Sequence, residues 1–160
     1  MSARLRWVIV ALSLAGATCL AIGAQGGRWF WLGETIAVGP TGTMSCFNGD
    51  CKTSDLSALQ ADDSEVWRRA GLGTAAAGLL GAIALVAVGG SLAAKRSGKL
   101  AAGATLTASL TGAVASAVFV ITRPSTDVPA TIGRGVVIYA VGLVLALAVA
   151  VFVLQRRAAR

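Results

Sequence analysis

Four long apolar segments, in which Arg6 near the start of the first is the only charged residue, constrain the fold of this chain more than any other feature. They cover residues 5–24, 70–93, 100–122 and 136–154. Each is close to the ~20 residues that a helix needs to cross the hydrocarbon core of a bilayer. A segment without charged side chains also avoids the cost of burying a charge there. The sequence therefore predicts a membrane all-α protein, with a four-transmembrane-helix bundle forming a single domain over residues 1–160.

The charged residues are divided unequally among the termini and connections. Of the 14 basic residues, eight lie in the two termini and in the connection between the second and third segments, where no acidic residue occurs. The other two connections carry six basic and all seven acidic residues. Because basic residues mark the cytoplasmic side of membrane helices, this split of +8 against −1 predicts a multi-pass plasma (inner) membrane protein with cytoplasmic N- and C-termini. The eight are Arg4, Arg6, Lys95, Arg96, Lys99, Arg156, Arg157 and Arg160.

The first segment has a competing interpretation as a cleaved signal peptide, because it begins with basic residues and ends near a small-x-small site at Ala21-Ile22-Gly23. Its apolar run is longer than the core of a usual signal peptide. We therefore expect the segment to be retained as a helix. Cys19 lies inside it and is expected to be an inert, small hydrophobic residue.

The connection over residues 25–69 is too long to be a simple turn and is predicted to be extracytoplasmic. Aromatic and β-branched residues favour strands between residues 28 and 38. Residues 39–42, Gly-Pro-Thr-Gly, then indicate a turn. Residues 44–52 predict a hairpin with Asn48-Gly49 as a type I′ turn. The connection should thus contain a small antiparallel β-sheet.

Cys46 and Cys51 lie on either side of the predicted Asn-Gly turn. A metal site is one alternative, but the chain has no His and no other extracytoplasmic Cys to complete four ligands. Disulfides persist in oxidising compartments, where the charge distribution places this segment. We therefore expect a disulfide between these two residues.

An acidic cluster near the end of the same connection comprises Asp62, Asp63 and Glu65. Calcium binding is one interpretation. We favour the other, in which the acids stabilise the N-terminus of the second long helix through its dipole. Asp55 is expected to cap a short helix over residues 55–59. No metal or cofactor is predicted.

These features together resemble the claudin and peripheral myelin protein superfamily. The likeness rests on four spans, a tryptophan-bearing first exported segment with two cysteines, and the stretch from Cys51 to Gln60, with Arg68 and Arg69 at the start of the second span. The chain differs in carrying Thr43-Met44-Ser45 where the family has Gly-Leu-Trp. The resemblance implies a left-handed four-helix bundle capped by a small antiparallel sheet.

Small residues recur at four-residue spacing in every span, which is typical of close helix packing in membranes. Val149 is expected to face lipid instead. Hydroxyl groups in the third span could line a polar path, but such groups usually bond backbone carbonyls or bridge helices. The glycines expected at helix contacts are Gly73, Gly78, Gly81, Gly112 and Gly142, and the hydroxyl residues are Thr105, Thr107, Ser109, Thr111 and Ser116.

No nucleophile–base pair, phosphate loop or metal spacing is present, so an enzyme is not expected. The leading hypothesis is a structural or interaction protein within a larger membrane assembly. Its partners would be the lipid bilayer and another membrane protein or a second copy, with no nucleic acid. Trp29, Phe30 and Trp31 are the predicted partner-binding residues, and an interfacial aromatic belt is the alternative. The alternative function is a channel or transporter, or an accessory subunit that regulates one.

Overall fold

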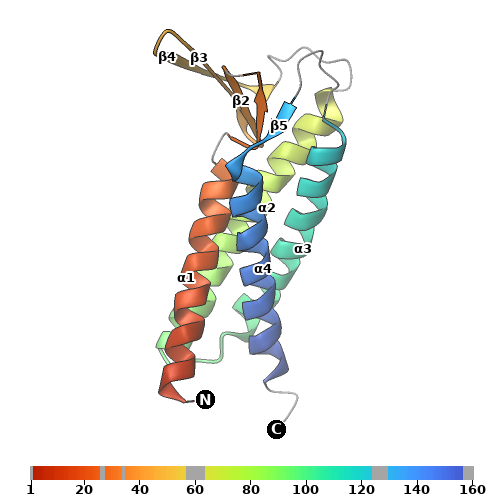
Figure 1. The fold of residues 1–160 in the computed structure, drawn as a ribbon. Coiled ribbons are helices and arrows are strands. Elements are labelled where there is room, and N and C mark those ends of the chain that lie inside the picture. Colours follow the sequence, from red (N-terminus) through yellow and green to blue (C-terminus); the bar gives the residue numbers. More distant parts are fainter. Residues whose placement is uncertain (1, 26–27, 34, 57–63, 124–129, 157–160) are drawn as a thin grey trace.

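The computed structural model describes residues 2–25, 28–33, 35–56, 64–123 and 130–156. Four long helices run side by side as a bundle, and a small sheet lies at one end (Figure 1). The start of the first helix and the end of the last lie together at the opposite end. All four are long and apolar enough to cross a membrane, which suggests a multi-pass membrane protein. They are α1 (Ala3–Gln25), α2 (Ser64–Ala93), α3 (Lys99–Ile121) and α4 (Arg134–Gln155).

The helices include nearly all of the four predicted spans, and three of them differ from the predicted bounds by two residues or fewer at each end. The exception is α2, which begins at Ser64, six residues before the apolar segment that starts at residue 70. Apolar content marks where a helix can enter a bilayer, but hydrogen bonding can extend the same helix through polar residues. An ion pair between Arg69 and Glu65, one turn apart, stabilises this added turn.

The sheet is antiparallel and has five strands in the order β4-β3-β2-β1-β5. Four of them form the predicted sheet of the first long connection. The fifth comes from the second connection and pairs with β1, with Trp31 opposite Thr131. The sequence did not indicate this strand. The strands are β1 (Phe30–Leu32), β2 (Ile36–Gly39), β3 (Gly42–Phe47), β4 (Asp50–Ser54) and β5 (Ala130–Ile132).

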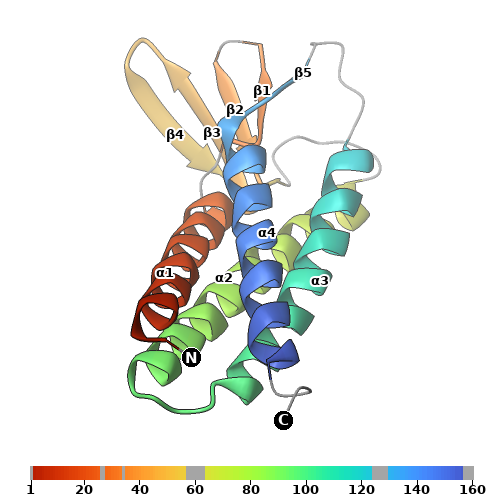
Figure 2. The ribbon, with the colours of Figure 1, turned by 60° about the horizontal axis from the view of Figure 1, so that its bottom comes forward.

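The turn between β3 and β4 has the predicted geometry. Asn48 has a φ of 49° and Gly49 a φ of 91°, and both central residues of a type I′ turn require positive φ. Phe47 pairs with Asp50, and Cys46 pairs with Cys51. The hairpin extends away from the helices (Figure 2).

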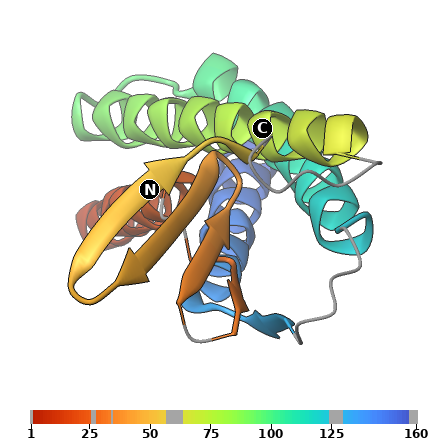
Figure 3. The same cartoon turned by 90° about the horizontal axis from the view of Figure 1, so that it is seen from above.

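Each helix packs mainly against two neighbours, so that the order around the bundle is α1, α2, α3, α4. Seen along the bundle, the sheet lies over α1 and α4 and leaves α3 uncovered (Figure 3). The core continues from the bundle into the sheet, because buried residues of both belong to one cluster that includes Leu20, Leu85 and Val38. The sheet is therefore fixed to the helices by packing as well as by chain connections.

Candidate functional site at the junction of bundle and sheet

Five aromatic residues meet where the sheet joins the bundle. The Trp67 ring of α2 stacks on Phe119 of α3 with centroids 4.9 Å apart, and its Nε1 donates a hydrogen bond of 2.9 Å to the Phe119 carbonyl. Trp29 contacts Phe119 edge-on at 5.7 Å and Tyr139 of α4 at 5.2 Å. Phe30 of β1 lies 6.0 Å from Phe119. The cluster thus joins three helices to the first strand.

The polar atoms of this buried cluster have partners. Trp29 Nε1 donates to the Gly23 carbonyl in the last turns of α1, at 2.7 Å. The Tyr139 hydroxyl donates to the Thr74 carbonyl of α2, at 3.0 Å. Because an unpaired buried donor would cost about 1–3 kcal/mol, these bonds fix the orientation of both rings.

The prediction that Trp29, Phe30 and Trp31 contact a partner is wrong for the first two. Trp29 is 1% exposed and Phe30 is 3% exposed. Trp29 lies before β1, and its ring is held by the Gly23 carbonyl against Tyr139 rather than on the outer face of a strand. Strand alternation then turns Trp31 away from the core, and it is half-buried, with the Arg28 guanidinium 5.9 Å from the ring centroid.

Three glycines from different helices surround Tyr139. A Cβ at Gly23 would lie 2.7–2.9 Å from the Tyr139 backbone and Cβ, and one at Gly78 would lie 2.7 Å from the Tyr139 ring. A Cβ at Gly112 would lie 2.6 Å from the Tyr139 hydroxyl oxygen. Gly78 and Gly112 were among the predicted packing positions. Gly23 was not, because the small-residue spacing of the first span pointed to other positions.

The other predicted packing glycines differ in how closely a neighbour approaches. A Cβ at Gly142 would lie 2.8 Å from the Leu20 backbone nitrogen, and one at Gly81 would lie 3.2 Å from the Leu20 side chain. At Gly73 the nearest atom would be 3.6 Å away, which is ordinary contact, so this position has room for a methyl group. Val149, expected to face lipid, is 3% exposed and lies in the core, so that expectation is wrong.

The hydroxyl groups of α3 mostly bond their own helix. Thr105 donates to the Ala101 carbonyl at 2.8 Å, and Ser116 to the Ala113 carbonyl at 3.0 Å. Thr107 similarly donates to the carbonyl one turn earlier. Among the described residues, Ser109 Oγ is buried without a hydrogen-bond partner. The hydrogen bonds of Thr105, Thr107 and Ser116 are thus made within α3, as is usual for hydroxyl groups on membrane helices.

The β3–β4 hairpin is the most exposed part of the sheet. Every residue of β4 is exposed, and Phe47 at the tip is 62% exposed. The predicted disulfide between Cys46 and Cys51 is present and links the two strands beside the turn. Cys19 is a free cysteine, half-buried in α1. The hairpin therefore presents an aromatic side chain on a cross-linked support.

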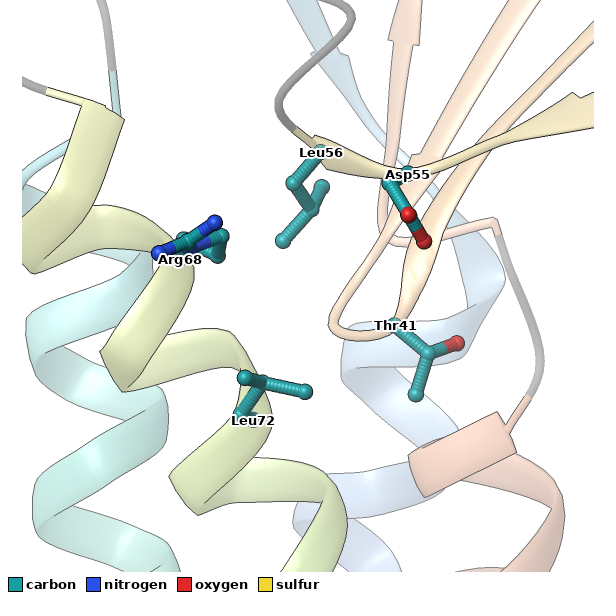
Figure 4. A pocket seen from close by; sticks show the side chains of 5 residues that line it. All are labelled: Thr41, Asp55, Leu56, Arg68 and Leu72. Carbon is teal, nitrogen blue, oxygen red and sulfur yellow. The ribbon is translucent and has the colours of Figure 1, made fainter.

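A small pocket lies between the sheet and the start of α2 (Figure 4). It has a volume of about 190 Å³. Arg68 and Leu72 of α2 form one wall, and Thr41, Asp55 and Leu56 form the other.

Two sequence predictions concern residues outside the described ranges. Asp62 and Asp63 of the acidic cluster are among them, as is most of the short helix expected over residues 55–59. Glu65 lies in the first turn of α2, where its charge is favourable for the helix dipole. Within the described part of the chain, no group of three or more His, Cys, Asp or Glu side chains is arranged to hold a metal ion.

Comparison with known proteins gives no relative from which a role could be transferred. A scan against protein-family models and a search of curated protein sequences both found no match for this chain.

Proposed function

We propose that this protein is a multi-pass membrane protein, similar in design to the claudin-like tetraspans, that binds another membrane protein or a second copy through its extracytoplasmic sheet. Lipid contact is supported by the large apolar side chains that remain exposed on the outside of the bundle. Leu80 is 62% exposed, Val114 66% and Val144 65%. Such a surface would favour aggregation in water, whereas the acyl chains of a bilayer would cover it.

The proposed orientation has two independent supports. Basic residues without acids occur at the end of the bundle where α1 begins and α4 ends, as the positive-inside rule requires of a cytoplasmic face. The disulfide lies at the other end, and disulfides persist in oxidising compartments outside the cytoplasm.

The observation that carries the binding proposal is the hairpin with Phe47 at its tip. An exposed aromatic residue supplies a large contact area, and aromatic residues are common among the residues that dominate interface energies. The disulfide holds the tip in one geometry before a partner arrives, which lowers the entropy lost on binding. The partner site thus moves from residues 29–31, where the sequence placed it, to the tip of the hairpin.

Co-purification in mild detergent tests this proposal. We expect stoichiometric partners with the wild-type protein, and a loss of about tenfold or more in recovered partner with Phe47→Ser, since a hot spot contributes at least ~2 kcal/mol. Ile132→Ser is the matched control, because Ile132 is an equally exposed apolar residue on β5, at the opposite edge of the same sheet. Partner recovery that survives Phe47→Ser, or that is lost equally with Ile132→Ser, would contradict binding at the tip.

A further inference from the structure

The pocket between the sheet and α2 has walls that are held in place by a close contact. A Cβ at Gly71 would lie 2.5 Å from the Pro40 carbonyl oxygen and 3.2 Å from the Leu56 side chain. The glycine therefore lets the turn between β2 and β3 rest directly on α2. Leu56 is 3% exposed and points towards α2 from the sheet side (Figure 4). The pocket is thus a fixed feature of the junction.

One wall of the pocket changes from charged to apolar along the axis of α2. Arg68 belongs to the polar start of the helix, and Leu72, one turn further on, belongs to its apolar segment. Four residues of helix separate them by about 6 Å along the axis. A molecule that fills the pocket would therefore need a polar end at Arg68 and an apolar end at Leu72.

The two charged residues of the pocket lie on opposite walls. In Figure 4 the Asp55 carboxylate is on the Thr41 side, across the open space from the Arg68 guanidinium. Among the residues that the structure describes, the ion pair formed is that of Arg69 with Glu65, and Arg68 and Asp55 do not pair with each other. An occupant that carries both an anionic and a cationic group would complement this separation.

We propose that the pocket binds the head group of a phosphatidylethanolamine lipid, with the phosphate at Arg68 and the ammonium group at Asp55. Guanidinium groups bind phosphate oxygens through two parallel hydrogen bonds, and an ammonium group donates hydrogen bonds to a carboxylate. The acyl chains would leave the pocket over Leu72, which is 55% exposed. This inference rests on the proposed function, because a lipid reaches the pocket only if α2 spans a bilayer.

The volume of the pocket agrees with a head group. Its volume is about 190 Å³. Pockets for drug-sized ligands are larger, at about 300–1,000 Å³. The pocket therefore has room for a phosphoethanolamine group but not for a whole lipid or a large solute.

The test measures the thermal unfolding of the full chain in phosphatidylcholine nanodiscs with phosphatidylethanolamine or phosphatidylglycerol added. We expect a higher unfolding temperature with phosphatidylethanolamine alone, since phosphatidylglycerol has no ammonium group and the quaternary ammonium of phosphatidylcholine cannot donate a hydrogen bond. Charge-assisted hydrogen bonds change an affinity by about tenfold or more. Arg68→Gln and Asp55→Asn should therefore each abolish most of the increase.

Arg69→Gln is the matched control, because Arg69 is the adjacent arginine of the same helix but pairs with Glu65 and does not line the pocket. Equal stabilisation by the two added lipids, persistence of the increase in both pocket variants, or its equal loss in Arg69→Gln would overturn the inference. So would an equal increase with soluble glycerophosphoethanolamine, because the occupant would then be a free solute and not a lipid.

Alkaline carbonate extraction of membranes separates this inference from the proposed function. A chain released by carbonate is not integral to the membrane, and both proposals would then fail. A chain that remains in the membrane but is not stabilised by phosphatidylethanolamine overturns the lipid site alone.

Discussion

Gly23, Gly78 and Gly112 each allow a different helix to approach Tyr139, and the Tyr139 hydroxyl bonds the backbone of α2. A single side chain of α4 therefore contacts all three other helices. Close approach of this kind matters most in a bilayer, where van der Waals packing and interhelical hydrogen bonds replace the hydrophobic effect as the source of helix association.

Gly23→Ala should destabilise the bundle by about 1–3 kcal/mol, the usual cost of overpacking. The reason is that its Cβ would meet backbone atoms of Tyr139, which cannot rotate away as a side chain can. Unfolding by heat or by SDS in detergent measures the effect. Gly103→Ala is the control within a helix, because a Cβ there would meet nothing within 4 Å. Equal losses of stability for the two substitutions would show that contact with Tyr139 does not cause the effect of Gly23→Ala.

At the scale of elements, the sequence predicted most of the helices and strands but few of the contacts between them. Apolar length indicated the four helices, and turn residues indicated the strands of the first connection. The β5 strand was missed because a run of three residues, Ala130–Ile132, is too short to predict a strand by itself, and the strand depends on pairing with β1. Small-residue spacing likewise showed that Gly78 and Gly112 pack closely but could not show that both contact Tyr139.

The aromatic residues after the first span also show that tertiary contacts could not be predicted from the sequence. Alternation along a strand accounts for the different burial of Phe30 and Trp31. It could not predict that Trp29 would bond the Gly23 carbonyl and enter the core, because that bond depends on how the chain turns after α1. The lining of the pocket was also unpredictable, since it joins Thr41 to Arg68 and Leu72 through tertiary packing.

Replacing Cys46 and Cys51 with Ser should loosen the β3–β4 hairpin and leave the bundle unchanged. The loop that the disulfide closes is short, and the chain-entropy relation gives a stabilisation of about 2 kcal/mol for it. Hydrogen exchange should quicken for amides of residues 43–54 and stay constant in α1 to α4. Faster exchange throughout the helices would contradict a purely local role of the disulfide. Unchanged exchange in the hairpin would show that strand pairing holds it together without the disulfide.

At the scale of the whole molecule, the sheet and the eight basic residues that have no acidic residues among them lie at opposite ends of the bundle, so one orientation satisfies both the charge rule and the disulfide. This polarity also decides where each proposed site acts. The hairpin tip would face the outer solution, and the pocket beside Arg68 would lie at the level of the outer lipid head groups.

Labelling of introduced cysteines with a membrane-impermeant maleimide measures this orientation. In a Cys19→Ser background, Thr131→Cys should react in intact cells, whereas Ser97→Cys should react only after permeabilisation. Both positions are exposed, and they lie in connections at opposite ends of the bundle. The reverse pattern would place the sheet in the cytoplasm and invert the proposed topology.

The pairing of β5 with β1 has a mechanical consequence. The peptide N–H of Gly133 donates to the Trp29 carbonyl at 2.7 Å, immediately before α4 begins, and Trp29 follows closely on α1. A pulling force on the hairpin would therefore pass through β2 into β1 and divide there between the first helix and the last, while β4 would pass force along the chain to α2. Tension from outside would thus load the first and last helices together.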